Sequence, residues 1–138
     1  MSDELDVRAL ARVGSILHGK YRLDALLGVG GMAAVYSATH RNGLRVAVKL
    51  LHAHHAVDDD LRTRFLREGY AANRVDHRGA VRVLDDDTAD DGSVFLVMEL
   101  LEGQTVDAFW QRNGRRLPAT VVCELAVQLL DVLAAAHA

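Results

Sequence analysis

The chain contains a single cysteine, Cys123, so no disulfide can form within it. The formal net charge is −3, which gives no basic surface for a nucleic acid. The first residues, 1–6, are acidic and lack the apolar core of a signal peptide. No uninterrupted apolar run approaches the length of a membrane span. These absences predict a cytoplasmic protein with no nucleic-acid partner and no membrane segment, in which Cys123 is a small core residue.

What is present predicts one modest domain with a single core, since half of the 138 residues are hydrophobic and a quarter are charged. The sequence has no internal repeat and no low-complexity linker. Residues 1–13 alternate acidic and apolar positions, which fits either a short helix or a frayed tail.

From Tyr21 the pattern predicts strands. Residues 21–27 alternate with a period of two, a glycine cluster follows, and a short strand runs through Val35 and Tyr36. Asn42-Gly43 is a hairpin-turn signal before a strand at 45–50. Strands at 81–84 and 94–98 flank an acidic turn that contains Asp91-Gly92 and that we interpret as solvated. The sequence therefore predicts an α+β fold with a five-stranded antiparallel sheet and one helix against it.

Three acidic residues, 58–60, stand where a helix N-terminus favours negative charge. The helix that follows has one predicted face, which consists of Leu61, Phe65, Glu68, Ala72 and Val75. After Gly103 the chain is predicted to be helical, with Pro118 in a first turn. Residues 121–136 are apolar apart from a narrow stripe of Glu124, Gln128 and Asp131, which predicts a helix buried on most sides.

The glycine cluster, residues 27–35, reads Leu-Gly-Val-Gly-Gly-Met-Ala-Ala-Val. Glycines let backbone amides approach phosphate oxygens without a Cβ in the way, although a glycine-rich hairpin turn gives the same letters. A dinucleotide-binding fingerprint needs a helix directly after the glycines, and a strand follows here. The Gly-Lys-Ser/Thr ending of a Walker P-loop is also missing.

Lys49 lies in an otherwise apolar strand, and Glu68 lies on the apolar face of the predicted helix. Either residue alone fits a structural role, the lysine as an edge residue whose amine reaches solvent. A buried carboxylate calls for a cation, and a lysine in an apolar strand calls for an anion. In this order, behind a glycine cluster, the two residues are expected to pair.

Together these motifs resemble the small lobe and hinge of bacterial Hanks-type serine/threonine protein kinases, from about Gly14 to the last residue. The resemblance rests on the glycine segment, on Val-Ala-Val-Lys at 46–49, on Arg-Phe-Leu-Arg-Glu at 64–68, and on Leu-Val-Met-Glu-Leu-Leu-Glu-Gly at 96–103. It implies a tail at 1–13, a small lobe at 14–98, and a hinge with a partial large lobe at 99–138. The small lobe would hold ATP, which the family uses with Mg²⁺.

The resemblance also implies roles for individual residues. Gly28, Gly30 and Ala33 take the three glycine-loop positions. Lys49 would hold the α- and β-phosphates and Glu68 would orient it. The implied ATP-contacting set also includes residues that would enclose the adenine, bond its edge or contact the ribose, and in full it is Leu27, Gly28, Gly30, Gly31, Ala33, Val35, Ala47, Lys49, Glu68, Met98, Glu99, Leu101 and Thr105.

Three departures from the family pattern stand out. Ala33 replaces the third glycine, Gly69 follows the glutamate at a cost of about 1 kcal/mol relative to alanine in a helix, and residues 77–81 read His-Arg-Gly-Ala-Val. The His-Arg-Asp and Asp-Phe-Gly motifs are not among the 138 residues, so no metal ligand is expected, and a chain of these residues alone is expected to be inactive. The alternative hypotheses are a non-catalytic nucleotide-binding or regulatory module, or a remnant without function. The protein substrate stays open, and the apolar helix at 117–138 could self-associate or bind a partner.

Two further clusters carry less weight. His52, His54 and His55 could suggest a metal, but three histidines within four loop residues cannot all point the same way. The acidic residues 85–87 and 90–91 resemble a calcium loop in composition only, because the spaced ligands and the terminal glutamate are missing.

Overall fold

The computed structural model describes residues 2–138, which divide into two compact units. The first unit comprises the residues up to Asn73 together with Val81–Leu100, and the second comprises Arg74–Ala80 together with Leu101–Ala138. These units differ from the predicted domains in three places, one of which is that residues 99–100, predicted with the hinge, group with the first unit. The N-terminal residues belong to the first unit, and the loop at 74–80 groups with the C-terminal helices.

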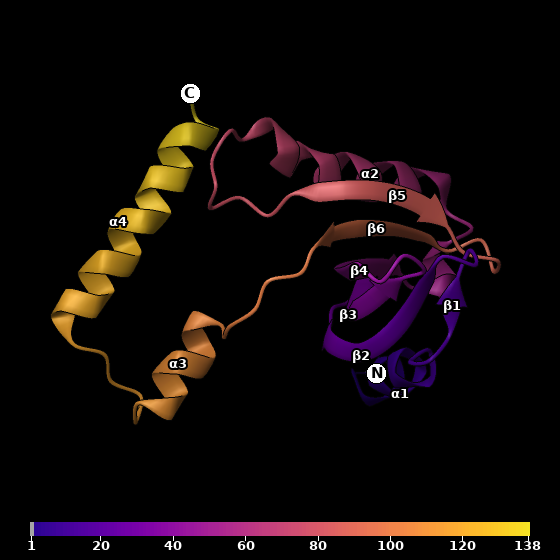
Figure 1. Ribbon diagram of the computed structural model, residues 1–138, viewed down its shortest axis with the longest axis horizontal. Coiled ribbons are helices and arrows are strands. Elements are labelled where there is room, and N and C mark those ends of the chain that lie inside the picture. Colours follow the sequence, from indigo (N-terminus) through magenta and orange to yellow (C-terminus); the bar gives the residue numbers. More distant parts are fainter. Residues whose placement is uncertain (1) are drawn as a thin grey trace. The chain divides into compact units, whose positions relative to one another are not determined.

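The first unit is built on an antiparallel sheet in the order β1-β2-β3-β4-β6-β5 (Figure 1). Each of its neighbouring strand pairs is antiparallel. All five predicted strands are present, and a two-residue strand at the edge adds a sixth. The strands are β1 Ile16–Leu17, β2 Tyr21–Val29, β3 Ala33–His40, β4 Arg45–Leu51, β5 Val83–Thr88 and β6 Val94–Glu99.

The predicted hairpin turn at Asn42-Gly43 joins β3 to β4. Gly43 has a φ of +90°, which side chains with a Cβ rarely adopt, and Asn42 Oδ1 accepts a hydrogen bond of 2.9 Å from the Leu44 amide. The Asn-Gly prediction is confirmed by this geometry.

The prediction for β5 was wrong in its position. The strand begins at Val83 rather than Val81, and the acidic residues 85–87 lie within it instead of forming a solvated turn. Tertiary contacts account for this. Lys20 lies in the turn before β2, and its Nζ is 3.1 Å from Asp87 Oδ2. The turn predicted at Asp91-Gly92 is present and spans 89–92, where Gly92 has a φ of +85°.

The two faces of the sheet are covered by different helices. Helix α1, Ser2–Ala11, resolves the open choice between a helix and a frayed tail. Ala9 is buried in a core with the side chains of β2, β3, β4 and β6 that point to this face, and the Tyr36 hydroxyl donates to the Ala9 carbonyl at 2.9 Å. Tyr36 therefore fixes α1 to the sheet through a buried hydrogen bond.

Helix α2, Asp59–Ala71, packs against β5 and β6 on the opposite face. The Asp58 side chain caps it by accepting from the Leu61 amide at 3.0 Å, and two more acidic residues lie in its first turn. Phe65 is its buried anchor, in a second core with Ala33, Leu51, Val83, Val94 and Leu96. The helix ends before the predicted Ala72, which opens the short 3-10 turn η2, Ala72–Arg74, and Val75 lies beyond both.

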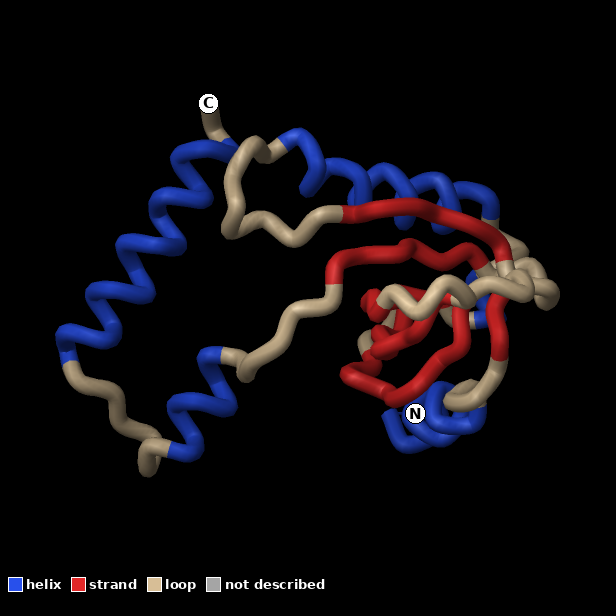
Figure 2. Tube along the Cα trace, in the orientation of Figure 1, coloured by secondary structure: helices blue, strands red, loops and turns tan. Residues whose placement is uncertain are grey.

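The second unit contains α3, Val106–Arg112, and α4, Ala119–Ala136 (Figure 2). The 74–80 loop contacts α4 through His77, whose Nε2 lies 2.7 Å from Asp131 Oδ2, and through Gly79. A Cβ at Gly79 would lie 2.5 Å from Val132 Cγ2, so only glycine fits against the helix there. The unusual His-Arg-Gly sequence of this connection therefore makes a close contact rather than a loose loop.

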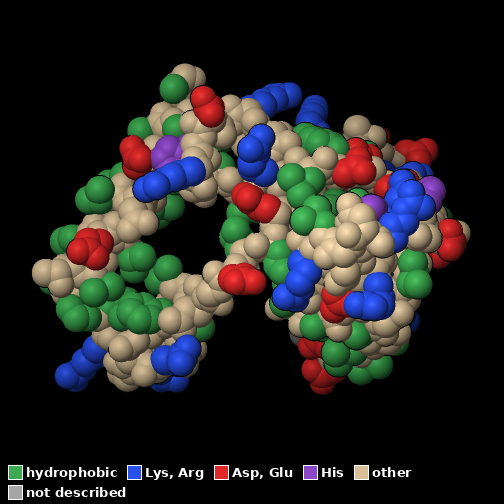
Figure 3. All heavy atoms as spheres, in the orientation of Figure 1, with side chains coloured by type: hydrophobic (Ala, Val, Ile, Leu, Met, Phe, Trp, Pro, Cys, Tyr) green, Lys and Arg blue, Asp and Glu red, His purple; other side chains and the backbone are tan. Residues whose placement is uncertain are grey.

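None of the residues of α4 is buried, which contradicts the expectation of a helix buried on most sides. Cys123 is exposed as well and is not a core residue. The spaced leucines and valines of α4 have no covering segment within residues 2–138, and Figure 3 shows hydrophobic side chains along its surface. With 18 residues and a mean hydropathy of 1.8, α4 also meets the length and composition of a membrane span, contrary to the sequence-based expectation. A single helix of this kind is weak evidence for a membrane, and α4 carries the charges of Glu124 and Asp131.

Candidate functional site

The strand register brings most of the predicted small-lobe residues to one face of the sheet. Val35 is directly opposite Lys49, and Lys49 is opposite Leu96. Two residues earlier on β4, Ala47 is opposite Met98. Directly opposed residues of an antiparallel pair project to the same side, so Val35, Ala47, Lys49 and Met98 share a face. This is the face on which α2 packs.

The glycine segment forms the hairpin between β2 and β3, at one end of this face. Its closing hydrogen bond runs from the Gly30 amide to the Ala33 carbonyl at 2.8 Å. Gly28, Gly30 and Gly31 all lie outside the positive-φ region. A Cβ would meet no atom within 4 Å at Gly28 or Gly31, and only the Ala33 carbonyl, at 3.4 Å, at Gly30. Neither backbone conformation nor internal packing therefore requires these glycines, whereas close approach of an external group would.

Leu27 and Ala33, two further residues of the glycine segment, differ in burial. Leu27 is exposed on β2 before the hairpin. Ala33 opens β3, and its side chain is buried in the core beside Leu51 and Phe65. Its methyl group thus serves packing under α2, which explains why an alanine is accommodated at the third glycine position.

Lys49 lines a cavity of about 200 Å³ between the sheet and α2, with Met32, Phe65, Glu68, Leu96 and Met98 among the other lining residues. The Lys49 side chain is half-buried, and its Nζ lies 5.8 Å from the centroid of the Phe65 ring. A cation over an aromatic face is weakly stabilised there. Among residues 2–138 the Lys49 amine has no ion pair with a carboxylate.

Glu68 lines the same cavity, but it is exposed rather than buried as the sequence predicted. Its Oε1 pairs with Arg64 Nε at 2.8 Å, one turn earlier on α2. Among residues 2–138 no ion pair joins Glu68 to Lys49. A carboxylate on a helix one turn from an arginine finds that partner locally, without any movement of the helix.

Gly69 is a residue whose role sequence reasoning missed. A Cβ on it would overlap Leu96 Cδ1 and would lie 3.2 Å from Cδ2. Because Leu96 is the strand partner of Lys49, this contact sets how closely α2 approaches the strand next to the lysine. The signal available in the sequence was a helix-weakening glycine directly after the key glutamate.

The remaining predicted residues lie at the end of β6 and beyond it. Glu99 is held to Arg82, since the Glu99 amide donates to the Arg82 carbonyl at 3.1 Å and the Arg82 amide donates to Glu99 Oε1 at 3.0 Å. Leu101 and Thr105 belong to the second unit. There Leu101 is exposed, and Thr105 caps α3 by accepting from the Ala108 amide at 3.1 Å.

Comparison with known proteins identifies this arrangement. The family model described as protein kinase domain matches residues 21–138. The chain belongs to the protein kinase domain family. Pkn1, a serine/threonine-protein kinase of Myxococcus xanthus, is 42% identical over 121 residues, which are 87% of this chain and 17% of Pkn1. The serine/threonine-protein kinase PknH of Mycobacterium bovis is 40% identical over 139 residues, which cover 100% of this chain and 22% of PknH.

The fold of this kinase chain agrees with a solved kinase. The crystal structure of the Mycobacterium tuberculosis PknI kinase domain superposes with a TM-score of 0.70 at 28% identity. The match covers 91% of this chain and 50% of the PknI structure. The resemblance drawn from the motifs and the α+β small-lobe fold are thereby confirmed. The chain spans about a fifth of the length of these two curated relatives and half of the PknI domain.

The donor set of this kinase site suits an anion rather than a metal. Lys49 is a cation, and the one carboxylate that lines the cavity, Glu68, is already paired with Arg64. Within residues 2–138 no three histidine, cysteine, aspartate or glutamate side chains converge as metal ligands. A triphosphate fits the lysine and the glycine amides, and Mg²⁺ would have to arrive on the phosphates themselves.

Proposed function

We propose that the first unit binds the adenine nucleotide ATP, in a protein that transfers a phosphoryl group from ATP to serine or threonine hydroxyls of other proteins. One observation carries the proposal: the strand register puts Lys49 on the same sheet face as Val35 and Met98, at the end where the glycine hairpin lies. A cation, unhindered amides and an apolar wall are the elements that a nucleotide with a charged tail requires.

The role proposed for each residue follows from its position. The amides of the glycine hairpin and the Lys49 amine would hold the phosphates, and Val35, Ala47 and Met98 would enclose the adenine. Leu27 and Gly28 would close over the nucleotide from β2, and Glu68 would orient Lys49 once its contact with Arg64 is given up. The backbone of Glu99 and Leu101 and the side chain of Thr105 are proposed to complete the adenine and ribose contacts. Since ATP is a cytoplasmic metabolite, we place this unit in the cytoplasm.

An affinity label tests the nucleotide site directly, because the chain has only two lysines, Lys49 and Lys20. Lys20 is paired with Asp87 and does not line the cavity. An acyl-phosphate derivative of ATP should acylate Lys49, and an excess of ATP should suppress this. Lys20 serves as the internal control. Equal labelling of the two lysines, or labelling that ATP does not suppress, would contradict the proposal.

Binding strength gives a second measure. The described residues are proposed to contact the phosphates, and no metal ligand is proposed among them, so we expect a dissociation constant of about 0.1–1 mM, equivalent to roughly −4 to −5.5 kcal/mol. Titration calorimetry with the Lys49→Met variant as comparison should show the affinity falling further.

Phosphoryl transfer is expected to need groups that these 138 residues do not carry. A purified polypeptide of residues 1–138 should therefore incorporate no labelled phosphate from ATP, either into itself or into a generic protein substrate. Incorporation that disappears in the Lys49→Met variant would show instead that the described residues hold a complete catalytic site.

A further inference from the structure

The residue after β4, His52, makes the single side-chain hydrogen bond that reaches the glycine hairpin, segment 27–32, from another element of the described chain. Its Nε2 lies 2.8 Å from the carbonyl oxygen of Gly30. A carbonyl oxygen can only accept, so Nε2 must carry the proton, in the neutral ring and in the charged ring alike.

Backbone pairing explains how His52 reaches this position. Ala33 is opposite Leu51 in the β3–β4 register, and one step beyond it the His52 amide donates to the Met32 carbonyl at 3.0 Å. The backbone of His52 thus holds Met32, just before β3, and its ring holds Gly30, just after β2. The same residue therefore holds both sides of the hairpin.

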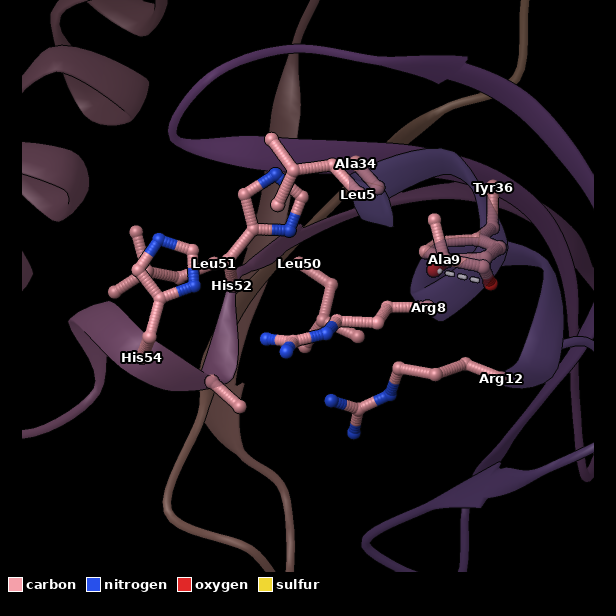
Figure 4. Close-up of a pocket in the computed structure, with 11 residues that line it drawn as sticks. Leu5, Arg8, Ala9, Arg12, Ala34, Tyr36, Leu50, Leu51, His52 and His54 are labelled. Carbon is pink, nitrogen blue, oxygen red and sulfur yellow. Dashed lines mark hydrogen bonds between the residues drawn. The ribbon is translucent and has the colours of Figure 1, made fainter. Parts of the chain in front are cut away.

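The side of the sheet on which the ring lies matters. Side chains alternate along a strand, so His52 projects to the same face as Leu50 and opposite to Lys49. In agreement, His52 lines a cavity beside α1 together with Leu50, Ala9 and Arg8, and Figure 4 shows its ring among these residues. The Gly30 carbonyl is therefore drawn toward the α1 face.

The carbonyl of Gly30 and the amide of Gly31 belong to one peptide group, and the described chain has no cis peptide bond. In a trans peptide the C=O and N–H bonds point in opposite directions. When the Gly30 carbonyl is directed toward His52, the Gly31 amide is directed toward the opposite face, where Lys49 lies.

We propose that His52 is a positioning residue for phosphate binding, which holds the Gly30–Gly31 peptide with its N–H toward the Lys49 face and its carbonyl oxygen away from the phosphates. Without this bond the flexible Gly-Gly peptide can rotate and present a carbonyl oxygen to an anion. The bond fixes a donor in advance, so less conformational freedom is lost when the nucleotide binds. This inference rests on the proposed nucleotide site.

The test compares three variants of the full chain. His52→Leu removes the ring donor and should weaken ATP binding by about threefold to tenfold, the worth of one oriented hydrogen bond. His52→Gln places an amide donor at a similar reach and should recover affinity to within about twofold of the parent chain. His54→Leu is the matched control. His54 stacks on His52 with ring centroids 5.7 Å apart and lines a cavity with Gly31, but within residues 2–138 its ring makes no hydrogen bond to the hairpin, so the affinity of this variant should be unchanged.

Two readouts that do not use ATP separate this inference from the proposed function. A long-range ¹⁵N–¹H spectrum of the His52 ring should show the proton on Nε2 in the parent chain. Hydrogen exchange of the Gly31 amide should change in His52→Leu and not in His54→Leu.

A proton on Nδ1 with a bare Nε2, or unchanged Gly31 exchange in His52→Leu, overturns the His52 role even if ATP binds. If the parent chain does not bind ATP, the proposed function and the phosphate-positioning role both fail. The two readouts then still decide whether the hydrogen bond from His52 to Gly30 exists. If ATP binds and His52→Gln is no better than His52→Leu, the hydrogen bond is not what positions the hairpin.

Discussion

Gly69 of α2 lies directly against Leu96 of β6, so closely that a side chain at position 69 would occupy the same space as the leucine. A Cβ there would lie 3.2 Å from Leu96 Cδ2 and 3.3 Å from Cγ, and it would overlap Cδ1. Leu96 is only 1% exposed and is the strand partner of Lys49. A glycine that weakens the helix therefore brings α2, with Glu68, close to the strand beside the lysine.

Replacing Gly69 with alanine tests this contact. Helix propensity alone would add about 1 kcal/mol of stability, whereas forcing a methyl group into a packed core costs about 1–3 kcal/mol. Because Leu96 is buried and cannot swing into solvent, we expect a net loss of about 1 kcal/mol, measured by urea denaturation. In a Leu96→Ala background, which opens space, the same glycine substitution should become stabilising. A Gly69→Ala chain that is more stable than the parent would show that the helix is not held this closely.

Arg64 holds the carboxylate that is proposed to orient Lys49, so we expect the Arg64–Glu68 pair to compete with a Lys49–Glu68 pair. The side chains of Arg64 and Glu68 are both exposed, so solvent screens this pair and it is easily given up. Arg64→Met should release Glu68 toward Lys49 and strengthen ATP binding by about twofold, measured by titration calorimetry. Arg67→Met is the control, because no ion pair of Arg67 is found among residues 2–138. The idea fails if Arg64→Met gains no affinity over this control, or if the gain survives Glu68→Gln.

Tyr70 links α2 to β5 and should titrate late. Its hydroxyl donates to Asp86 Oδ1 at 2.5 Å, and this hydrogen bond is the main reason that the pKa of Tyr70 is raised to about 12. A raised pKa means that the folded state favours the protonated phenol. Its contribution to stability is therefore complete below the ordinary tyrosine pKa of about 10 and is lost as the pH rises from 10 to 12.

Tyr70→Phe should accordingly cost about 0.5–1.5 kcal/mol at neutral pH, and this difference from the parent chain should shrink above pH 10. Tyrosinate absorbance should show one late titration step that the variant lacks. The difference between the parent and Tyr70→Phe titrations isolates Tyr70 from Tyr21 and Tyr36, whose pKa values burial also raises. If that difference titrates near pH 10, the Asp86 bond does not form in solution.

The apolar surface of α4 should make a polypeptide of these 138 residues associate. Leu129 and Leu130 are 61% and 62% exposed and Leu133 is 42% exposed. Leaving such side chains in water forgoes roughly 1.5–3 kcal/mol each, and light scattering should report species larger than a monomer. Changing the three leucines to glutamate should reduce scattering while the sheet stays folded.

Val132→Glu is the contrasting variant, since it inserts a charge where Gly79 packs and should loosen the 74–80 loop rather than improve solubility. Two results together would indicate that α4 packs against residues within the described chain: the parent chain is a well-behaved monomer, and the triple glutamate variant is unfolded.

The sequence by itself determined the elements and the family. Period-two alternation located β2, the acidic run at 58–60 located the start of α2, and Asn42-Gly43 located a turn, because each depends on local backbone geometry. The glycine segment and the motifs at 46–49, 64–68 and 96–103 carried the kinase resemblance together, since each is recognisable from residue types and spacing alone.

Only the tertiary structure decided what depends on neighbours distant in sequence. The acidic residues 85–87 form a strand because β6 and Lys20 lie beside them, and α4 is exposed because no described segment covers it. Glu68 pairs with Arg64 because that partner is one helical turn away, while Lys49 reaches the same cavity from another strand. The close fit of Gly69 to Leu96 and the bond from His52 to Gly30 follow from strand register and helix packing, which no local pattern encodes.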